Sequence, residues 1–471
     1  VAMSDRDDFA AGPLDSRRAQ IEALVPVAMR LVADWEDRFG PYAAHPSTAL
    51  DPAALDAALS AFAQRMDTNY PFFHPRFAGQ MLKPPHPAAV AGYLAGMLVN
   101  TNNHSLDGGP ATTWMEREAV TQIAAMLGLP DDGIGHLTGG GTVANLEALF
   151  VARQLRPGTA VAHSAQSHYT HARMCHVLGI ESRAIHCDAA GRMDLDALEA
   201  QLKTGEVGTV VLTAGTTGTG AVDPIRDALG LRDRYGVRLH VDAAYGGFFT
   251  LLARSGDPLV PADLSAVGAC DSVVIDPHKH GLQPYGCGAI LLGDPDLSRF
   301  YQHDSPYTYF TSDDLHLGEI ALECSRPGAS AAALWFTLQL LPLEAERGLG
   351  PILAASLRAA RDFAGRVRDG DALVLLQAPP LDIVTYFPDR AAASAVDAAS
   401  RAVLEAGMAA DDPVFLSLLQ VDADALAAAR PGLARDADGA SVLRSVLMKP
   451  EHELATAWLH GRVSALAAAA G

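Results

Sequence analysis

The chain is organised around residues 272–282, whose sequence is SVVIDPHKHGL. The apolar run at 272–275 has the β-branched composition of a buried strand, and the Gly and Pro residues around Lys279 are typical of a turn. We therefore expect Lys279 to stand where a buried strand ends. Burial desolvates a primary amine and disfavours its ammonium form, which makes the amine available as a nucleophile. A solvated lysine at the rim of the sheet is the alternative that this stretch alone leaves open.

A second apolar run, residues 239–247 with the sequence LHVDAAYGG, supplies groups that would complement an aldehyde cofactor. A strand-end lysine suits a Schiff base, and pyridoxal 5′-phosphate (PLP) is the commonest aldehyde that forms one. The PLP ring needs a carboxylate at its pyridine nitrogen, for which Asp242 is a candidate. It also needs a small residue against one face, and Ala244 lies two positions further on the same side of a strand. These residues and Lys279 predict a PLP site.

The two motifs resemble those of fold-type I PLP enzymes, in particular the group II amino-acid decarboxylases. That group includes the glutamate, aromatic amino-acid and archaeal-type tyrosine decarboxylases, and the matching motifs run from residue 74 to about residue 327. The resemblance implies PLP as cofactor, decarboxylation of an L-amino acid to its amine and CO2, and a homodimer with active sites at the subunit interface. It implies an α/β fold with a three-layer, mostly parallel sheet. The expected parts are an N-terminal helical arm (1–65), a large PLP-binding domain (66–345) and a small C-terminal α+β domain (346–471).

Composition narrows the class of protein and of partner. A chain of 471 residues with 49% hydrophobic content can bury a large core and form more than one domain. Its formal net charge of -20 argues against nucleic acid or an anionic membrane as a partner. Its 5 cysteines are scattered, which predicts a reduced, cytoplasmic protein without a disulfide framework. We see no apolar run long enough to span a bilayer, and residues 1–8 lack the pattern of a secretory signal.

A glycine-rich turn at residues 137–147, with the sequence LTGGGTVANLE, leads into a predicted helix. A helix that begins in such a turn offers free backbone N–H groups and a positive dipole end, which suits a phosphate. Gly140, Gly141 and Thr142 are the candidates, and the resemblance places the PLP phosphate there. It also implies a cofactor contact for His278.

Short apolar runs alternate with helical stretches after residue 159, which predicts an α/β fold with its ligand at the carboxyl ends of the strands. A second set of runs after residue 345 predicts the small domain. Two amphipathic helices, at 16–39 and from Pro52 onward, either cover the large domain or clasp a partner subunit, and the resemblance favours the clasp. The expected strands are 159–163, 184–186, 209–213, 238–241, 272–275, 288–292, 372–376, 382–387, 415–420 and 442–448.

Histidines are frequent between residues 163 and 186, and a helix is expected at 168–178. On that helix His168 and His171 have the spacing of metal ligands. No cysteine or carboxylate falls at matching spacing, so we expect no metal. The resemblance implies instead that His168 stacks on the PLP ring, and that Thr216 lies near the 3′-oxygen of the ring. His171 and His176 are then expected to face solvent.

The segment 74–112 is irregular and polar, and it resembles the segment that lines the substrate pocket in related decarboxylases. His104, Leu106 and Asp107 are therefore candidate substrate contacts, and together with Arg76 they could serve an acidic, basic or polar side chain. An aromatic group commonly stands where His104 and Leu106 are in the aromatic amino-acid enzymes. This departure weakens the expectation of a bulky aromatic substrate.

Two further assignments come from the resemblance alone. Ser325 matches a serine that reaches the PLP phosphate of the neighbouring subunit. Tyr307 and Tyr309 match a loop tyrosine that protonates Cα after CO2 has left, and the sequence does not separate the two. Two alternative functions stay open: carbon–carbon cleavage of the sphingosine-phosphate-lyase type, whose Arg-Pro-Gly element matches residues 326–328, and a non-catalytic PLP-binding role.

Overall fold

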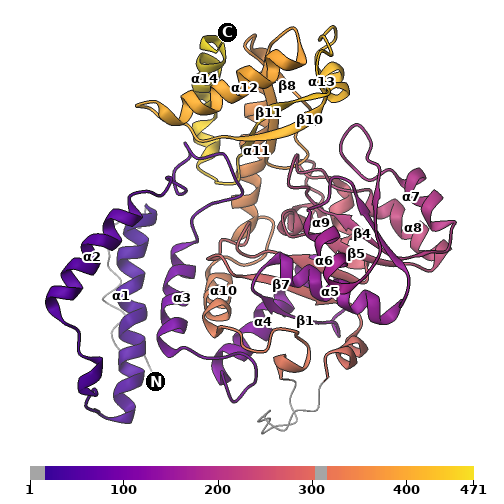
Figure 1. Ribbon diagram of the computed structural model, residues 1–471. Coiled ribbons are helices and arrows are strands. Elements are labelled where there is room, and N and C mark those ends of the chain that lie inside the picture. The colour runs from indigo at the N-terminus through magenta and orange to yellow at the C-terminus, as the bar shows by residue number, and fades with distance from the viewer. Residues whose placement is uncertain (1–15, 303–315, 471) are drawn as a thin grey trace.

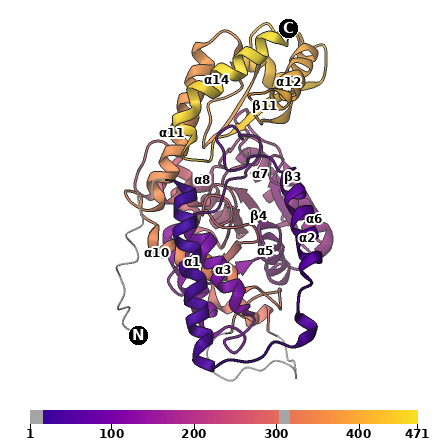
Figure 2. The same ribbon diagram turned by 90° about the vertical axis from the view of Figure 1, so that its left-hand side faces the viewer.

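The computed structural model describes residues 16–302 and 316–470 of the chain. Tyr307 and Tyr309 lie outside the described residues. Two β-sheets, each with its own helices, form the body of the molecule, and two N-terminal helices stand beside the larger part (Figures 1 and 2). Within the described ranges, the length and hydropathy of the helices identify none as a membrane span.

Seven strands form the large sheet in the order β1-β7-β6-β5-β4-β2-β3. The strands from β6 to β3 pair in parallel, whereas β7 runs antiparallel to both of its neighbours. The six runs predicted for this sheet are confirmed, but β1 was not predicted, because Gly and His interrupt its apolar pattern. The strands are β1 (Ile134–Thr138), β2 (Ala160–Ser164), β3 (Ser182–Ile185), β4 (Val207–Thr213), β5 (Arg238–Asp242), β6 (Ser272–Ile275) and β7 (Gly288–Leu292).

Helices cover both faces of this sheet, as the alternation of its buried side chains shows. On β6, Val274 packs in one apolar cluster with side chains of α5, while Val273 and Ile275 pack in another that contains Ile123 of α4. Strands buried on both faces have continuous apolar sequences, which is why these runs were recognisable. The helices are α4 (Pro110–Leu127), α5 (Gly141–Leu155), α6 (Thr170–Leu178), α7 (Leu195–Leu202), α8 (Ile225–Tyr235), α9 (Thr250–Arg254) and α10 (Gly328–Leu340).

The small sheet is antiparallel throughout, in the order β10-β11-β9-β8, and confirms the four strand-like runs expected after residue 345. Helix α11 joins the two parts (Figure 1): Leu349 and Leu353 belong to the core of the large sheet, and Phe363 and Val367 to that of the small one. The elements are α11 (Leu349–Asp369), β8 (Leu373–Leu375), β9 (Ile383–Pro388), α12 (Ala393–Ala409), β10 (Ser417–Asp422), α13 (Ala423–Ala429), β11 (Gly439–Val446) and α14 (His452–Ala469).

The N-terminal region consists of α1 (Arg17–Glu36), α2 (Pro52–Met66) and α3 (Pro87–Val99). Helix α3 lies within the segment that the sequence analysis treated as irregular, and its apolar run begins after a cap at His86. It packs tightly on α10, because a Cβ on Gly92 or Gly96 would fall within 3.0 Å of the α10 backbone. Helix α1 lies against α3, whereas α2 buries none of its residues in this chain.

Candidate active site

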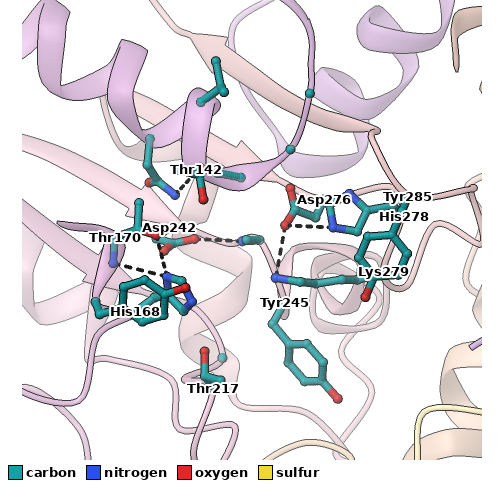
Figure 3. A pocket seen from close by; sticks show the side chains of 18 of the residues that line it. Thr142, His168, Thr170, Thr217, Asp242, Tyr245, Asp276, His278, Lys279 and Tyr285 are labelled. Carbon is teal, nitrogen blue, oxygen red and sulfur yellow. Dashed lines mark hydrogen bonds and ion pairs between the residues drawn. The ribbon is translucent and has the colours of Figure 1, made fainter. Parts of the chain in front are cut away.

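A cavity of about 380 Å³ opens where β4, β5 and β6 end, at the carboxyl edge of the parallel strands (Figure 3). This is the edge where open α/β sheets bind ligands. The lining residues include the glycine-rich turn before α5 and both strand-end motifs. They are Gly139, Gly140, Gly141, Thr142, Val143, Asn145, His168, Tyr169, Thr170, Thr213, Gly215, Thr217, Asp242, Ala244, Tyr245, Asp276, His278, Lys279, Tyr285 and Gly286.

Lys279 follows β6 by four residues and directs its amine into the cavity, as its sequence position predicted (Figure 3). Its side chain is 20% exposed, and Nζ lies 3.1 Å from Oδ2 of Asp276, the residue directly after the strand. The sequence analysis assigned no role to Asp276. The Lys279 amine is therefore paired with a carboxylate rather than isolated in the cavity.

Asp242 ends β5 inside the sheet and is 5% exposed. Its Oδ1 accepts a hydrogen bond from the backbone N–H of Ala244, and its Oδ2 accepts one from Nε2 of His171 at 2.8 Å. Burial alone would raise the pKa of Asp242, but the His171 hydrogen bond, the charge of His171 and the charge of Lys279 together hold it well below its ordinary value. The site therefore contains a fixed negative charge at the position that the sequence predicted.

His171 corrects the sequence analysis, which expected it to face solvent. The side chain is fully buried and carries the Asp242 contact, whereas His176 is exposed as expected. The predicted helix began at residue 168, but α6 begins at Thr170, so His171 lies in the first turn, where the helix faces the sheet. No group of three metal-ligating side chains is found among the described residues.

The glycine-rich turn makes an anion cradle at the start of α5. Gly140 adopts φ 139°, a conformation that favours glycine, and the first N–H groups of the helix have no intrahelical acceptor. Gly141 packs against Asp276, since a Cβ at Gly141 would lie 2.8 Å from a carboxylate oxygen. Thr142 lines the same end of the cavity, so all three predicted residues border it. On the outer side, the N–H of Gly139 donates to Glu323.

His278 lies between the glycine turn and Tyr285. Its Nδ1 donates to the carbonyl of Cys287 at 2.8 Å, and its Nε2 lies 3.5 Å from Asp276. Burial lowers the pKa of His278, so the ring is neutral with its proton held at Nδ1. The ring of Tyr285 packs against it with centroids 4.5 Å apart.

His168 borders the cavity just before α6, next to Asp242 in Figure 3. Its Nδ1 accepts a hydrogen bond from the backbone N–H of Thr170, so the neutral ring carries its proton on Nε2. Burial lowers the pKa of His168, which favours this neutral form. The Tyr169 ring lies beside it at a centroid distance of 4.2 Å. Stacking of His168 on a cofactor ring stays a prediction.

Five predicted residues do not border the cavity in this chain. Thr216 is buried in its turn, where its hydroxyl accepts a hydrogen bond from the N–H of Ala221, while the next residue, Thr217, lines the cavity. In this chain, therefore, Thr217 and not Thr216 borders the cavity, and the contact of Thr216 with the cofactor stays a prediction. The other four are Ser325, His104, Leu106 and Asp107.

The candidate substrate segment contacts the end of the loop before α10 instead. The N–H of Leu106 donates to Nδ1 of His316, and the carbonyl of His104 accepts from the N–H of Gly318. Ser325 is exposed beside it, next to Arg326, whose buried guanidinium pairs with Glu116 at 2.6 Å. These contacts hold the segment near the surface of the chain.

Arg444 lies behind the cavity wall, and the sequence analysis gave it no role. It comes from β11 of the small domain, is 7% exposed, and donates to the carbonyls of Thr217 and Gly218 at 2.6 and 3.0 Å. No carboxylate of the described residues lies within ion-pair distance of it. No sequence signal joined residue 444 to a turn more than 200 positions earlier, because β11 reaches that turn only through the folded small domain.

The residues of this chain fit PLP. A glycine cradle at a helix start can hold the phosphate, a buried carboxylate stands ready for the pyridine nitrogen, and Ala244 offers a small side chain beside it. One Asp276 oxygen has no hydrogen-bond partner in the described chain although it is buried, so this end of the cavity is incomplete by itself.

Comparisons with known proteins agree with this class of site. Residues 55–378 match the pyridoxal-dependent decarboxylase conserved domain. The chain is 32% identical over 271 residues to a probable L-tyrosine/L-aspartate decarboxylase of Methanoculleus marisnigri, covering 57% of this chain and 70% of that protein. It is 30% identical over 316 residues to the L-aspartate/L-glutamate decarboxylase of Pyrococcus horikoshii, covering 66% of this chain and 79% of that protein. The crystal structure of mouse CSAD aligns with a TM-score of 0.76 at 20% identity, covering 96% of this chain and 99% of that one.

The chain belongs to the pyridoxal-dependent decarboxylase family. It is a PLP-dependent amino-acid decarboxylase, a carboxy-lyase, with the fold-type I architecture that the sequence predicted. The predicted fold class, cofactor and reaction are confirmed.

Proposed function

We propose that this decarboxylase acts on a short acidic amino acid, with aspartate preferred over glutamate. When bound, PLP supplies an electron sink for the pair left at Cα as CO2 departs. The chain's own part is to bind, orient and move protons. Lys279 holds the cofactor through its amine, Asp242 balances a proton on the ring nitrogen, and the glycine turn binds the phosphate.

The observation that supports an acidic substrate is the buried guanidinium of Arg444, which has no carboxylate within ion-pair distance among the described residues. It donates to the carbonyls of Thr217, Gly218 and Gly79 and to the hydroxyl of Ser417. A buried cation whose hydrogen bonds all go to neutral groups retains a charge that a substrate carboxylate can neutralise. The rest of the wall is polar: among the lining side chains only Val143 and Ala244 are aliphatic. Relatives of this chain bear the names of aspartate, glutamate, tyrosine and 2,4-diaminobutyrate decarboxylases, so their names alone leave carboxylate, phenol and amine side chains open.

The test is a substrate panel with the PLP-loaded enzyme. Aspartate, glutamate, tyrosine, ornithine and 2,4-diaminobutyrate are each supplied, with CO2 and the amine product both measured. We expect the highest kcat/KM with aspartate. Arg444→Lys should raise the KM for aspartate by about tenfold, because lysine keeps the charge but loses the planar geometry. Arg366→Gln, which removes an exposed arginine paired with Asp362, is the matched control. Preference for tyrosine or for a basic amino acid would overturn the proposed specificity.

A homodimer completes the proposal. Helix α2 carries Leu55, Leu59, Phe62 and Met66 on one face, each between 41% and 63% exposed. Such an apolar face requires a partner, and a second copy of the chain suits it because four predicted site residues lie outside the cavity of their own chain. Phe62→Asp should shift the protein toward monomer in sedimentation, whereas Leu454→Asp, at a residue 91% exposed on α14, should not. An unchanged mass for Phe62→Asp would show that α2 is not the contact.

The state of the cysteines bears on the compartment of the protein. All five cysteines are free thiols, and three of them, Cys175, Cys270 and Cys287, are buried. Free buried thiols suit a reducing compartment, so we propose the cytoplasm.

A further inference from the structure

A buried polar cluster joins the small domain to the two turns that carry Lys279 and Asp242. Asp382 stands just before β9 and is fully buried. Its Oδ1 accepts a 2.5 Å hydrogen bond from the hydroxyl of Tyr245, which lines the cavity three residues after Asp242. Its Oδ2 lies 3.3 Å from Nε2 of His280, the residue directly after Lys279.

The cluster is enclosed on all sides. His280 is fully buried, with its ring 4.9 Å from that of Tyr245 and 4.7 Å from that of Phe249. Neither ring nitrogen of His280 has a properly aligned hydrogen bond among the described residues. The charged groups that act on this cluster come from other elements: Lys83 before α3, Arg361 on α11 and Arg444 on β11.

The segment that presents Asp382 is anchored in the large domain. Leu381 and Ile383, on either side of it, belong to the core of the large sheet. Arg361 donates to the carbonyls of Pro380 and Leu259, which fastens the loop before β9 to the large domain. These contacts fix the position of Asp382, which can in turn fix the positions of Tyr245 and His280.

We propose that Asp382 is a positioning residue, which sets the distance between Lys279 and Asp242 by accepting the hydrogen bond of Tyr245 and packing against His280. The two turns come from adjacent strands, and Asp382 contacts one residue in each of them, Tyr245 and His280. Burial and the nearby Asp382 charge raise the pKa of Tyr245 well above its ordinary value, so its hydroxyl stays protonated and donates. The inference rests on the PLP site described above but not on the identity of the substrate.

The test compares Tyr245→Phe, Asp382→Asn and their double variant with Tyr386→Phe. The control also removes a buried tyrosine hydroxyl from β9, one that bonds to Ser445 within the small domain. We expect Tyr245→Phe and Asp382→Asn to lower kcat by about 10- to 100-fold, the cost of a small misplacement of reacting groups, with KM within about twofold. The double variant should be no slower than the slower single variant, and Tyr386→Phe should stay within about twofold of the wild type.

A second measurement does not depend on turnover. In hydrogen exchange of the cofactor-free protein, Asp382→Asn should speed exchange at both 242–247 and 277–283, and visible circular dichroism of the PLP-loaded variant should change in shape. Equal losses of kcat in Tyr386→Phe, multiplicative losses in the double variant, or unchanged exchange at both turns would each overturn the proposal. If Asp382→Asn does not fold, Tyr245→Phe decides it by the same readouts. If the wild type binds PLP with a normal visible dichroism spectrum but does not prefer aspartate, the result counts against the proposed specificity and not against the role of Asp382.

Discussion

The candidate site has two regions, and only one of them borders the cavity of its own chain. The floor, defined as Gly140–Thr142, Asp242 and Lys279, surrounds one cavity within this chain. The rim, defined as residues 104–107 and Ser325, lies outside that cavity. Floor residues end adjacent strands or begin the helix beside them, so formation of the sheet alone brings them together. The difference shows that one chain brings its candidate cofactor residues together, whereas its candidate substrate residues and Ser325 lie apart from them.

The strongest test of the floor is Lys279→Ala. We expect activity to fall by roughly 10⁴-fold or more, as loss of a covalent catalytic group costs other enzymes. PLP should then bind only through the phosphate and ring contacts. Borohydride reduction of the wild type followed by peptide mapping should find the cofactor on Lys279. Recovery of the adduct on another lysine, such as the buried Lys83 or Lys449, would remove Lys279 from the floor.

Asp242→Asn is expected to have the next largest effect. A neutral amide cannot balance a protonated ring nitrogen, and removal of one preorganised electrostatic group costs about 10²- to 10³-fold in kcat. The depressed pKa of Asp242 keeps the wild-type carboxylate charged throughout the neutral range. The Asn amide that replaces it does not titrate, so raising the pH should not recover the lost activity. His171→Gln should give a smaller loss, because Asp242 keeps its charge and the Ala244 hydrogen bond. Near-wild-type rates in Asp242→Asn would contradict the assignment.

The floor was also the part that the sequence could predict. Continuous apolar runs marked the parallel strands, and each functional residue followed directly on its run, so a strand assignment placed the side chain. Errors came where one or two residues changed the geometry. Helix α6 begins at Thr170 rather than at residue 168, which turned His171 from a solvent-facing residue into the buried partner of Asp242.

Contacts between distant segments could not be predicted. Arg444 and Asp382 come from the small domain, and Tyr245 meets Asp382 across 137 positions of sequence. Neither residue lies in a pattern that distinguishes it from an ordinary strand or loop residue. Strand β1 was missed for a related reason. Its Gly and His weaken the apolar pattern, and the strand is stabilised by hydrogen bonds to β7, which follows far later in the sequence.

Tyrosine variants test whether residue 307 or residue 309 supplies the proton that Cα needs. Phe at the effective position, Tyr307 or Tyr309, should lower amine formation by about 10²-fold, the usual contribution of a positioned acid. Aldehyde and pyridoxamine phosphate should rise, because the proton then reaches the cofactor instead of Cα. Phe at the other position should leave the product ratio unchanged. If both variants partition products as the wild type does, the proton comes from elsewhere.

Ser325→Ala should have the smallest effect, and it tests directly whether a rim residue serves its own chain or the neighbouring one. Loss of one hydroxyl contact to a phosphate should weaken PLP binding by about tenfold, which is about 1.4 kcal/mol, with little change in kcat at saturating PLP. Co-expression of Ser325→Ala and Lys279→Ala chains with different tags allows isolation of the mixed dimer. If Ser325 reaches across the interface, the Lys279-containing site of that dimer receives an intact serine from its neighbour and activates at the wild-type PLP concentration. If Ser325 acts within its own chain, the same site activates only at the higher PLP concentration that the Ser325→Ala homodimer requires. Ser325 and the floor residues would then serve the same active site of one chain.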